Sequence, residues 1–190
     1  CMSIASFYAT KMMTCGEGGM VLTDDEAFAE CIRDSRDYDN RDRYKRRFSY
    51  KMTDMQAAMG RVQLKRLPEF VARRREIAQQ YTGAFRELPL GLPDTAGHVY
   101  FRYVVKTPER EALESHLLEN GVEAKRPVFQ PAHLYFQDYS AGADVSLRDT
   151  YPGADEAHAQ ALSLPIYPAL SDDDVSIVID KTHQFFNVRN

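Results

Sequence analysis

Lys11 is the residue in this sequence whose chemistry could organise a reactive site. It ends a short run of strand-like composition that contains Phe7, Tyr8 and Thr10, and the glycine-rich turn Gly16–Gly19 follows it. A lysine amine at the end of a strand can serve as nucleophile or base once burial or nearby cations lower its pKa. Most lysines are solvated surface residues, because burying an ammonium is costly. The rest of the sequence therefore has to decide the role of Lys11.

Composition places the chain among soluble globular proteins. It has 190 residues, of which 44% are hydrophobic and 27% charged, enough for one domain or two small ones. The net charge of -4 argues against a nucleic-acid partner, because binding phosphates requires a positive surface. No apolar run reaches the length that a membrane helix needs. We expect neither nucleic acid nor membrane as a partner.

Cysteines and histidines show no metal-binding spacing. The cysteines are odd in number and form no C-x-x-C pair, which favours a reducing, cytoplasmic setting. The histidines are scattered, so no metal site is expected. Position 1 is a cysteine rather than an initiator methionine, and we expect the chain to be the later part of a longer protein. The cysteines are Cys1, Cys15 and Cys31, and the histidines are His98, His116, His133, His158 and His183.

The elements around Lys11 are predicted as a hairpin followed by helices. The glycine turn leads into a second strand at 20–23, and a half-buried amphipathic helix follows from Glu26 to about Ser35. The charged segment 36–47 has no apolar period and is predicted to be an exposed loop. Thr53 and Gln56 form a capping box that starts a long helical stretch to about residue 88.

Pro68 divides that stretch into two helices or kinks a single helix. The run Arg73-Arg74-Arg75 on its second part is predicted to be a solvated face with partners such as Gln79 and Glu69. Residues 89–97 have linker composition and are the expected domain boundary.

The second half restarts as a layer of strands and covering helices. The pattern predicts strands at 99–106 and 122–125, a helix from about 107 that Gly121 stops, an irregular segment 126–139, a helix within 151–162, an extended segment 164–168, and a last helix capped by Ser171.

Five segments carry a resemblance to a known family. They are S-F-Y-A-T-K, G-E-G-G-M-V-L-T-D-D, M-T-D-M-Q-A-A-M-G, R-R-R-E-I-A-Q-Q-Y and L-S-L-P-I-Y-P. In this order and spacing they resemble the DegT/StrS-type (DegT/DnrJ/EryC/StrS) aminotransferases, pyridoxal-phosphate enzymes that aminate keto-sugars, usually nucleotide-linked. The resemblance covers nearly the whole chain. It implies the C-terminal portion of an α/β fold, PLP-dependent transferase fold type I.

The resemblance also implies a division into domains. Residues 1–95 would be the end of the large α/β, cofactor-binding domain, including interface helices, and residues 96–190 would be a small α+β domain. The first part of the family's fold, which holds the cofactor ring, has no counterpart in this chain.

The same resemblance assigns site residues. Lys11 would bind the aldehyde of pyridoxal 5'-phosphate as a Schiff base and then move the proton between substrate and cofactor. Ser6 would donate its hydroxyl to the cofactor phosphate. Ser49 occupies the position from which an amide or amine usually reaches the partner subunit's cofactor phosphate, with Lys51 as a compensating cation. Tyr8 stands where many members carry histidine.

The activity that the resemblance implies is ping-pong transfer of an amino group, with glutamate as the expected donor, to a keto-sugar in surface-polysaccharide or amino-sugar biosynthesis. The enzyme would be a homodimer with a shared active site. His133 sits where the family has a proline-x-histidine element at the site's rim, although a core-edge histidine fits equally. Two alternatives stay open: a PLP-dependent sugar dehydratase, whose relatives carry histidine in place of Lys11, and a catalytically silent domain that regulates or assembles.

Overall fold

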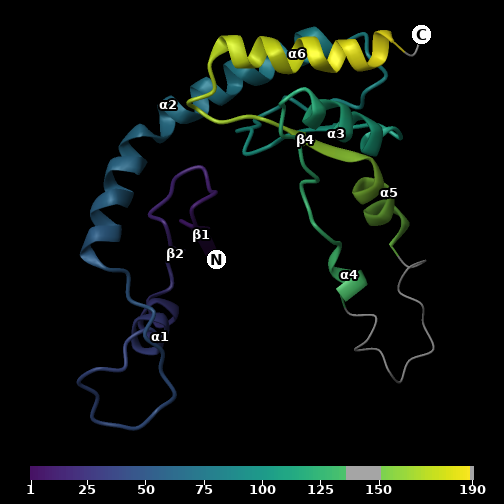
Figure 1. The fold of residues 1–190 in the computed structure, drawn as a ribbon. Coiled ribbons are helices and arrows are strands. Elements are labelled where there is room, and N and C mark those ends of the chain that lie inside the picture. The colour runs from purple at the N-terminus through teal and green to yellow at the C-terminus, as the bar shows by residue number, and fades with distance from the viewer. Residues whose placement is uncertain (136–150, 189–190) are drawn as a thin grey trace, which may run out of the picture. The chain divides into compact units, whose positions relative to one another are not determined.

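The computed structural model describes residues 1–135 and 151–188 and forms two compact units, Cys1–Phe70 and Val71–Asn190. Helix α2 (Asp54–Phe85) contributes residues to both units (Figure 1). The domain boundary expected near residue 95 stays a prediction. Residues 71–95 belong here to the second unit, because the buried side chains of Tyr81 and Phe85 form part of its core.

The first unit is built on the predicted hairpin. Strand β1 (Met2–Ser6) pairs antiparallel with β2 (Gly19–Thr23), so that Met2 lies opposite Thr23 and Ser6 opposite Gly19. Helix α1 (Glu26–Ser35) follows, and the carboxylate of Asp25 caps it by accepting from the Phe28 N–H at 3.2 Å. The hairpin and the bounds of this helix are confirmed.

The strand predicted to end at Lys11 ends earlier, at Ser6. The Phe7 N–H donates to the carbonyl of Gly18 at 2.8 Å, and the Cys15 N–H donates to the carbonyl of Phe7 at 3.0 Å, so the chain turns away from the sheet at this point. Residues 8–14 form the connection between the strands, and Lys11 lies in it, where its N–H donates to the Tyr8 carbonyl at 3.0 Å. The placement of Lys11 at a strand end was therefore wrong.

Two helices of this unit differ in how well they follow the pattern. Helix α1 has no fully buried residue: Ala29 and Ile32 on its apolar face are half-buried, whereas Phe28 and Cys31 are exposed, so the helix is covered less than expected. The capping box at the start of α2 is confirmed: the Gln56 N–H donates to Thr53 Oγ1 at 3.3 Å, and the Thr53 N–H returns to Gln56 Oε1 at 2.9 Å. Pro68 lies inside a single helix, since its fixed φ is helical and only one backbone hydrogen bond is lost.

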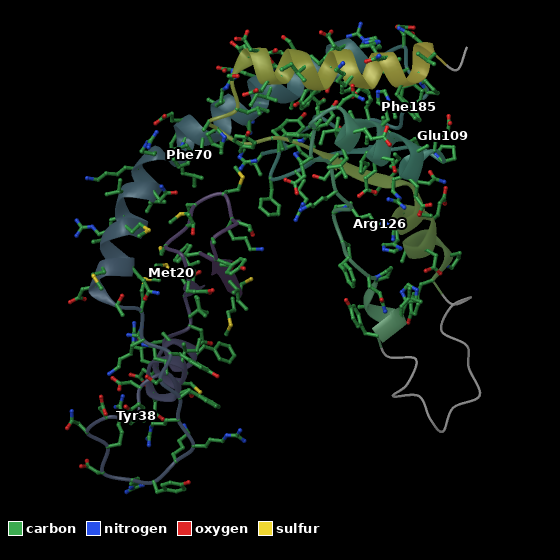
Figure 2. All side chains as sticks on the ribbon, viewed as in Figure 1. Met20, Tyr38, Phe70, Glu109, Arg126 and Phe185 are labelled. Atoms are coloured by element: carbon green, nitrogen blue, oxygen red, sulfur yellow. The ribbon has the colours of Figure 1, made fainter. Side chains whose placement is uncertain are left out.

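The second unit packs helices against a small sheet. Strand β3 (Tyr103–Lys106) pairs antiparallel with β4 (Ala161–Leu164), with Tyr103 opposite Leu164. Helices α3 (Arg110–Glu119) and α6 (Asp172–Asn187) contribute buried apolar side chains, among them Leu113, Leu117 and Phe185, the last labelled on α6 in Figure 2. Helices α4 (Ala132–Tyr135) and α5 (Pro152–Gln160) complete the described elements.

Several boundaries in this unit depart from the prediction. Strand β3 begins only at Tyr103, because Tyr100 adopts a positive φ of 51° and interrupts the extended chain. The helix predicted within 151–162 is confirmed as α5, which ends at Gln160, but the chain then continues as β4, a strand that was not predicted. The predicted strand at 122–125 is reduced to one bridge between Lys125 and Ser163.

Two helix boundaries of this unit are confirmed, and one segment differs from its prediction. Gly121 ends α3 with a φ of 79°, and Ser171 caps α6. Of the segment expected to be irregular, residues 132–135 form α4, and residues 136–139 lie outside the described residues. Across residues 1–135 and 151–188, no helix is long and apolar enough to cross a membrane.

Candidate active site

Lys11 lies on an exposed connection whose two ends are anchored by buried residues. Phe7 and Cys15, which flank the connection, are 7% and 3% exposed. Cys15 packs so closely on α2 that a Cβ at Gly60 would lie 2.7 Å from its Sγ. The anchored ends fix the connection on the unit, and the side chain of Lys11 itself is solvent-exposed.

Ser6 is the last residue of β1 and keeps a hydroxyl that can donate. Its Oγ accepts a long hydrogen bond from the Tyr8 N–H at 3.4 Å. A serine that accepts through a lone pair still has its O–H for a second partner, such as a phosphate oxygen. Ser6, Tyr8 and Lys11 thus come from one short piece of chain between β1 and β2.

Ser49 lies in a different segment, held beside the end of α1. The Phe48 N–H donates to the Ser35 carbonyl at 2.8 Å, and the Tyr50 N–H donates to the Arg36 carbonyl at 3.0 Å. The rings of Phe48 and Tyr50 stack with centroids 4.9 Å apart and leave Ser49 exposed between them. Its neighbours therefore fix the backbone at Ser49.

Lys51 is engaged within its own loop. Its Nζ lies 3.1 Å from Asp37 and 3.3 Å from Asp39, and the hydrogen bonds to these carboxylates raise the pKa of Lys51. Asp34 anchors the same loop through Arg47 at 2.8 Å and Lys45 at 2.9 Å. A role for Lys51 in binding a phosphate would require it to exchange these partners.

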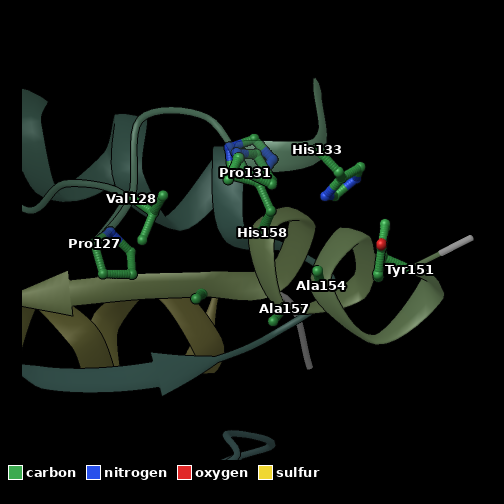
Figure 3. A pocket seen from close by; sticks show the side chains of 10 residues that line it. Pro127, Val128, Pro131, His133, Tyr151, Ala154, Ala157 and His158 are labelled. Atoms are coloured by element: carbon green, nitrogen blue, oxygen red, sulfur yellow. The ribbon is translucent and has the colours of Figure 1, made fainter. Parts of the chain in front are cut away.

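His133 lines an apolar cavity of the second unit rather than standing free at a surface. The cavity has a volume of about 660 Å³ (Figure 3). His133 Nε2 lies 2.9 Å from Asp155 Oδ1, and its ring lies 5.2 Å from that of Tyr151. The pair joins α4 to α5, and this contact gives His133 a structural role. A place at the rim of the active site stays a prediction.

The arginine run was expected to be a solvated face, which is wrong for Arg74. That residue is 7% exposed, and one of its terminal nitrogens donates to the carbonyls of Ile166, Tyr100 and Phe101 at 2.6, 3.1 and 3.3 Å. Burial lowers the pKa of the Arg74 guanidinium. The signal was in the sequence: Arg74 precedes Ile77 and Ala78 by three and four residues, which puts it on the buried face of α2.

The other two arginines of the run also have partners that the sequence did not suggest. Arg73 lies 2.8 Å from Asp172 and also contacts Glu76, and Arg75 Nε donates to the His98 carbonyl at 3.1 Å. The expected partners of the run, Gln79 and Glu69, differ from these, and Glu69 pairs with Arg66 at 2.9 Å.

The donor set around Lys11 suits pyridoxal phosphate. An amine that can condense with an aldehyde and a hydroxyl that can donate to a phosphate come from the same connection, at Lys11 and Ser6. By contrast, the described residues hold no group of three or more His, Cys, Asp or Glu side chains arranged to bind a metal ion. The chemistry open to this site is covalent attachment of a carbonyl compound and proton transfer by an amine.

Comparison with solved structures places the whole chain in one fold. It superposes on DesV from S. venezuelae, solved in complex with a ketimine intermediate, with a TM-score of 0.87 and 33% identity, over 97% of this chain and 51% of DesV. A second structure, the aminotransferase TlmJ from Streptoalloteichus hindustanus, gives a TM-score of 0.82 at 32% identity, over 100% of this chain and 53% of TlmJ. The fold is therefore a C-terminal portion of the α/β fold of these aminotransferases.

Sequence comparisons agree. The chain is 35% identical over 202 residues to the spore coat polysaccharide biosynthesis protein SpsC of Bacillus subtilis (strain 168), covering 92% of this chain and 51% of SpsC. It is 32% identical over 188 residues to dTDP-3-amino-3,4,6-trideoxy-alpha-D-glucose transaminase of Streptomyces venezuelae, covering 95% of this chain and 49% of that enzyme. The chain spans about half the length of the relatives it matches. The model of the DegT/DnrJ/EryC1/StrS aminotransferase family matches residues 1–183, and the chain belongs to this family.

Proposed function

We propose that this chain is part of a PLP-dependent aminotransferase that moves an amino group to a keto-sugar linked to a nucleotide. The observation that carries the proposal is Lys11, the only lysine on the anchored connection between β1 and β2, within a chain of this aminotransferase family. Relatives named as a dTDP-sugar transaminase and as GDP-perosamine synthase support a nucleotide-linked sugar as the substrate. Glutamate is the proposed amino donor.

Each proposed site residue has a separate task. Pyridoxal 5'-phosphate, when bound, supplies the electron sink for amino transfer. Lys11 would hold the cofactor aldehyde through its Nζ, and its amine would move a proton at the substrate carbon. Ser6 would orient the cofactor by donating its Oγ–H to the phosphate. An attacking amine needs a free electron pair, and a site closed off from water favours such an amine.

Closure of that site requires more polypeptide than this chain supplies. Lys11 and Ser6 are both exposed, as are Tyr8 and the apolar side chains of the hairpin. The chain covers 51% of SpsC, so the other half of a protein of that length would supply the remaining wall. We propose a homodimer in which Ser49, exposed between Phe48 and Tyr50, approaches the cofactor phosphate bound by the partner subunit.

The charged loop before Ser49 is evidence in favour of an anionic substrate. A cavity of about 480 Å³ is formed by this loop, and basic residues together with two tyrosines line it. Guanidinium groups bind phosphate oxygens through paired hydrogen bonds, and tyrosine rings can stack on a base. The lining comprises Tyr38, Arg41, Arg43, Tyr44, Lys45, Arg46 and Arg47.

The test compares Lys11→Ala with Lys65→Ala in the complete protein. Lys65 is an exposed lysine of α2 and serves as the matched control. Borohydride reduction followed by peptide mass analysis should add the cofactor mass to the Lys11 peptide alone. Lys11→Ala should lose this adduct and reduce transamination of a dTDP- or GDP-keto-sugar by at least about a thousandfold, with Lys65→Ala unchanged.

Three outcomes would count against the proposal. Full turnover in Lys11→Ala would disprove the central assignment. Release of water from the sugar without amino transfer would favour the dehydratase. A complete protein that never takes up the cofactor would favour a silent domain that regulates or assembles.

A further inference from the structure

A second cavity in the Val71–Asn190 unit has a composition unlike that of the apolar cavity at His133. It lies between one face of α2 and the loop 95–100, and its volume is about 400 Å³. Its lining includes several polar side chains and carries two guanidinium groups. The lining residues are Arg75, Gln79, Thr82, Gly83, Arg86, Thr95, Gly97, His98 and Tyr100.

Helical periodicity puts the two arginines on the same side of the cavity wall. Arg75 lies in α2 and Arg86 directly follows its last residue, Phe85; they are eleven residues apart, close to three helical turns, so we expect their Cα atoms about 16 Å apart along one face. Gln79 and Thr82 lie between them on that face. Two long side chains at this separation can converge on a ligand held between them.

The opposite wall is a loop of fixed conformation that presents a further donor. Gly97 and Tyr100 have positive φ values of 67° and 51°, and the Tyr100 N–H donates to His98 Nδ1 at 2.8 Å. Because Nδ1 is the acceptor, the hydrogen of the neutral imidazole is on Nε2, which is then a donor. The His98 carbonyl accepts from Arg75 Nε at 3.1 Å and so orients that guanidinium, whose other N–H groups remain available.

The arginines of this cavity have no acidic residue in the lining that the structure describes, whereas Arg73 and Arg110 of the same unit are paired with carboxylates. Arg73 pairs with Asp172, and Arg110 pairs with Glu111 and Glu114. Among the described residues that line the cavity, none is acidic. The nearby Asp94 is engaged locally, since its Oδ1 accepts from the Ala96 N–H at 3.0 Å.

We infer that this cavity binds a small oxyanion, a phosphate or carboxylate group, between Arg75 and Arg86. Guanidinium groups give paired, charge-assisted hydrogen bonds to such oxygens. The His98 Nε2–H, the Thr95 hydroxyl and the Gln79 amide supply neutral donors around the anion, whereas the Thr82 hydroxyl is bonded to the Tyr103 hydroxyl at 3.0 Å. None of the residues proposed to hold the cofactor belongs to this unit.

Gly83 offers a sharp test, because a Cβ added there meets no atom within 4 Å and the residue is helical. Gly83→Asp adds a carboxylate to the cavity wall, and Gly83→Asn adds a side chain of the same shape without charge. Inorganic pyrophosphate and citrate are titrated into the protein by calorimetry at constant ionic strength. One saturable site is expected, weakened at least about tenfold by Gly83→Asp and much less by Gly83→Asn.

A second pair of variants tests the positive charge of the Arg86 side chain. Arg86→Gln should weaken binding at least about tenfold, whereas Arg61→Gln, at an exposed position of α2 outside the cavity, should leave it unchanged. Binding of pyrophosphate alone or citrate alone supports the site and identifies the oxyanion. The absence of saturable binding overturns the proposal. So does an equal loss of oxyanion affinity in Gly83→Asp and Gly83→Asn, or in Arg86→Gln and Arg61→Gln. Cofactor and turnover play no part in this readout, so it is independent of the aminotransferase proposal.

Discussion

Asp34 shows how a single carboxylate orders the charged loop that precedes Ser49. Hydrogen bonds from Arg47 and then Lys45 lower the pKa of Asp34 from 3.8 to about 2. A carboxyl whose pKa is lower in the folded than in the unfolded chain stabilises the fold at pH values above its unfolded pKa. Its contribution is therefore complete above about pH 4 and is lost as the pH falls toward 2.

We expect Arg47→Gln to raise the pKa of Asp34 toward 3.8, because Arg47 is the largest cause of the lowering. A carbon-detected NMR titration of the Asp34 carboxyl measures this directly. Arg33→Gln is the control, since Arg33 pairs with Glu26 at 2.9 Å and not with Asp34. An Asp34 midpoint that Arg47→Gln leaves at about 2 would contradict the assignment of the cause.

At the residue scale, the sequence did not predict the surroundings of individual side chains. The motif predicts one site for Lys11 and Ser6, which stays a prediction, and the structure places both residues in the segment that begins with β1 and leads to β2. The strand end was misplaced, because the fold of the connection depends on bonds between Phe7, Cys15 and Gly18 that composition does not encode. Arg74 was misassigned because a charged residue type was given more weight than its position on the apolar face of α2.

At the element scale, helix caps carried most of the successful predictions. Thr53 and Ser171 each use a side-chain oxygen to satisfy a backbone N–H at a helix start, an interaction local enough to be predicted from the sequence. The cap of α1 is Asp25, which the sequence analysis did not single out. Strand β4 was missed because four residues, A-L-S-L, directly continue a helical segment. Its strand state comes from pairing with β3, whose residues are far away in the sequence.

Ser171 allows the cap of α6 to be measured. Its Oγ accepts from the Asp174 N–H at 3.1 Å, and the helix buries Val175, Val178 and Phe186 in the core. Ser171→Ala should lower the free energy of unfolding by about 1 kcal/mol, as measured by urea denaturation. The control is Ser176→Ala in the exposed interior of the same helix, which should be neutral or slightly stabilising because alanine is the better helix former. Equal effects of the two changes would exclude a specific cap.

At the scale of the whole chain, the two units differ in how much apolar surface they bury. The main core belongs entirely to the Val71–Asn190 unit, where Leu164 of β4 is 2% exposed. In the Cys1–Phe70 unit, the strands of the hairpin leave large apolar side chains in solvent, with Ile4 80% and Leu22 52% exposed, and Met20, labelled in Figure 2, 52% exposed. Such a sheet is stable only weakly unless further polypeptide covers it.

This difference predicts that a leucine-to-alanine substitution lowers the free energy of unfolding much more in the β3–β4 sheet than in the β1–β2 sheet. Leu164→Ala should cost about 2–5 kcal/mol in unfolding free energy, because it opens a cavity in a packed core, whereas Leu22→Ala should stay within about 0.5 kcal/mol in this chain. Hydrogen exchange should likewise be faster in β1 and β2 than in β3 and β4. The same pair in the complete protein then tests the proposed closure over the hairpin: there Leu22→Ala should become costly and slow exchange should extend to β2. A Leu22→Ala cost that stays near zero in the complete protein would mean that the remaining polypeptide does not cover this face, and Lys11 would lack the dry surroundings that its proposed chemistry requires.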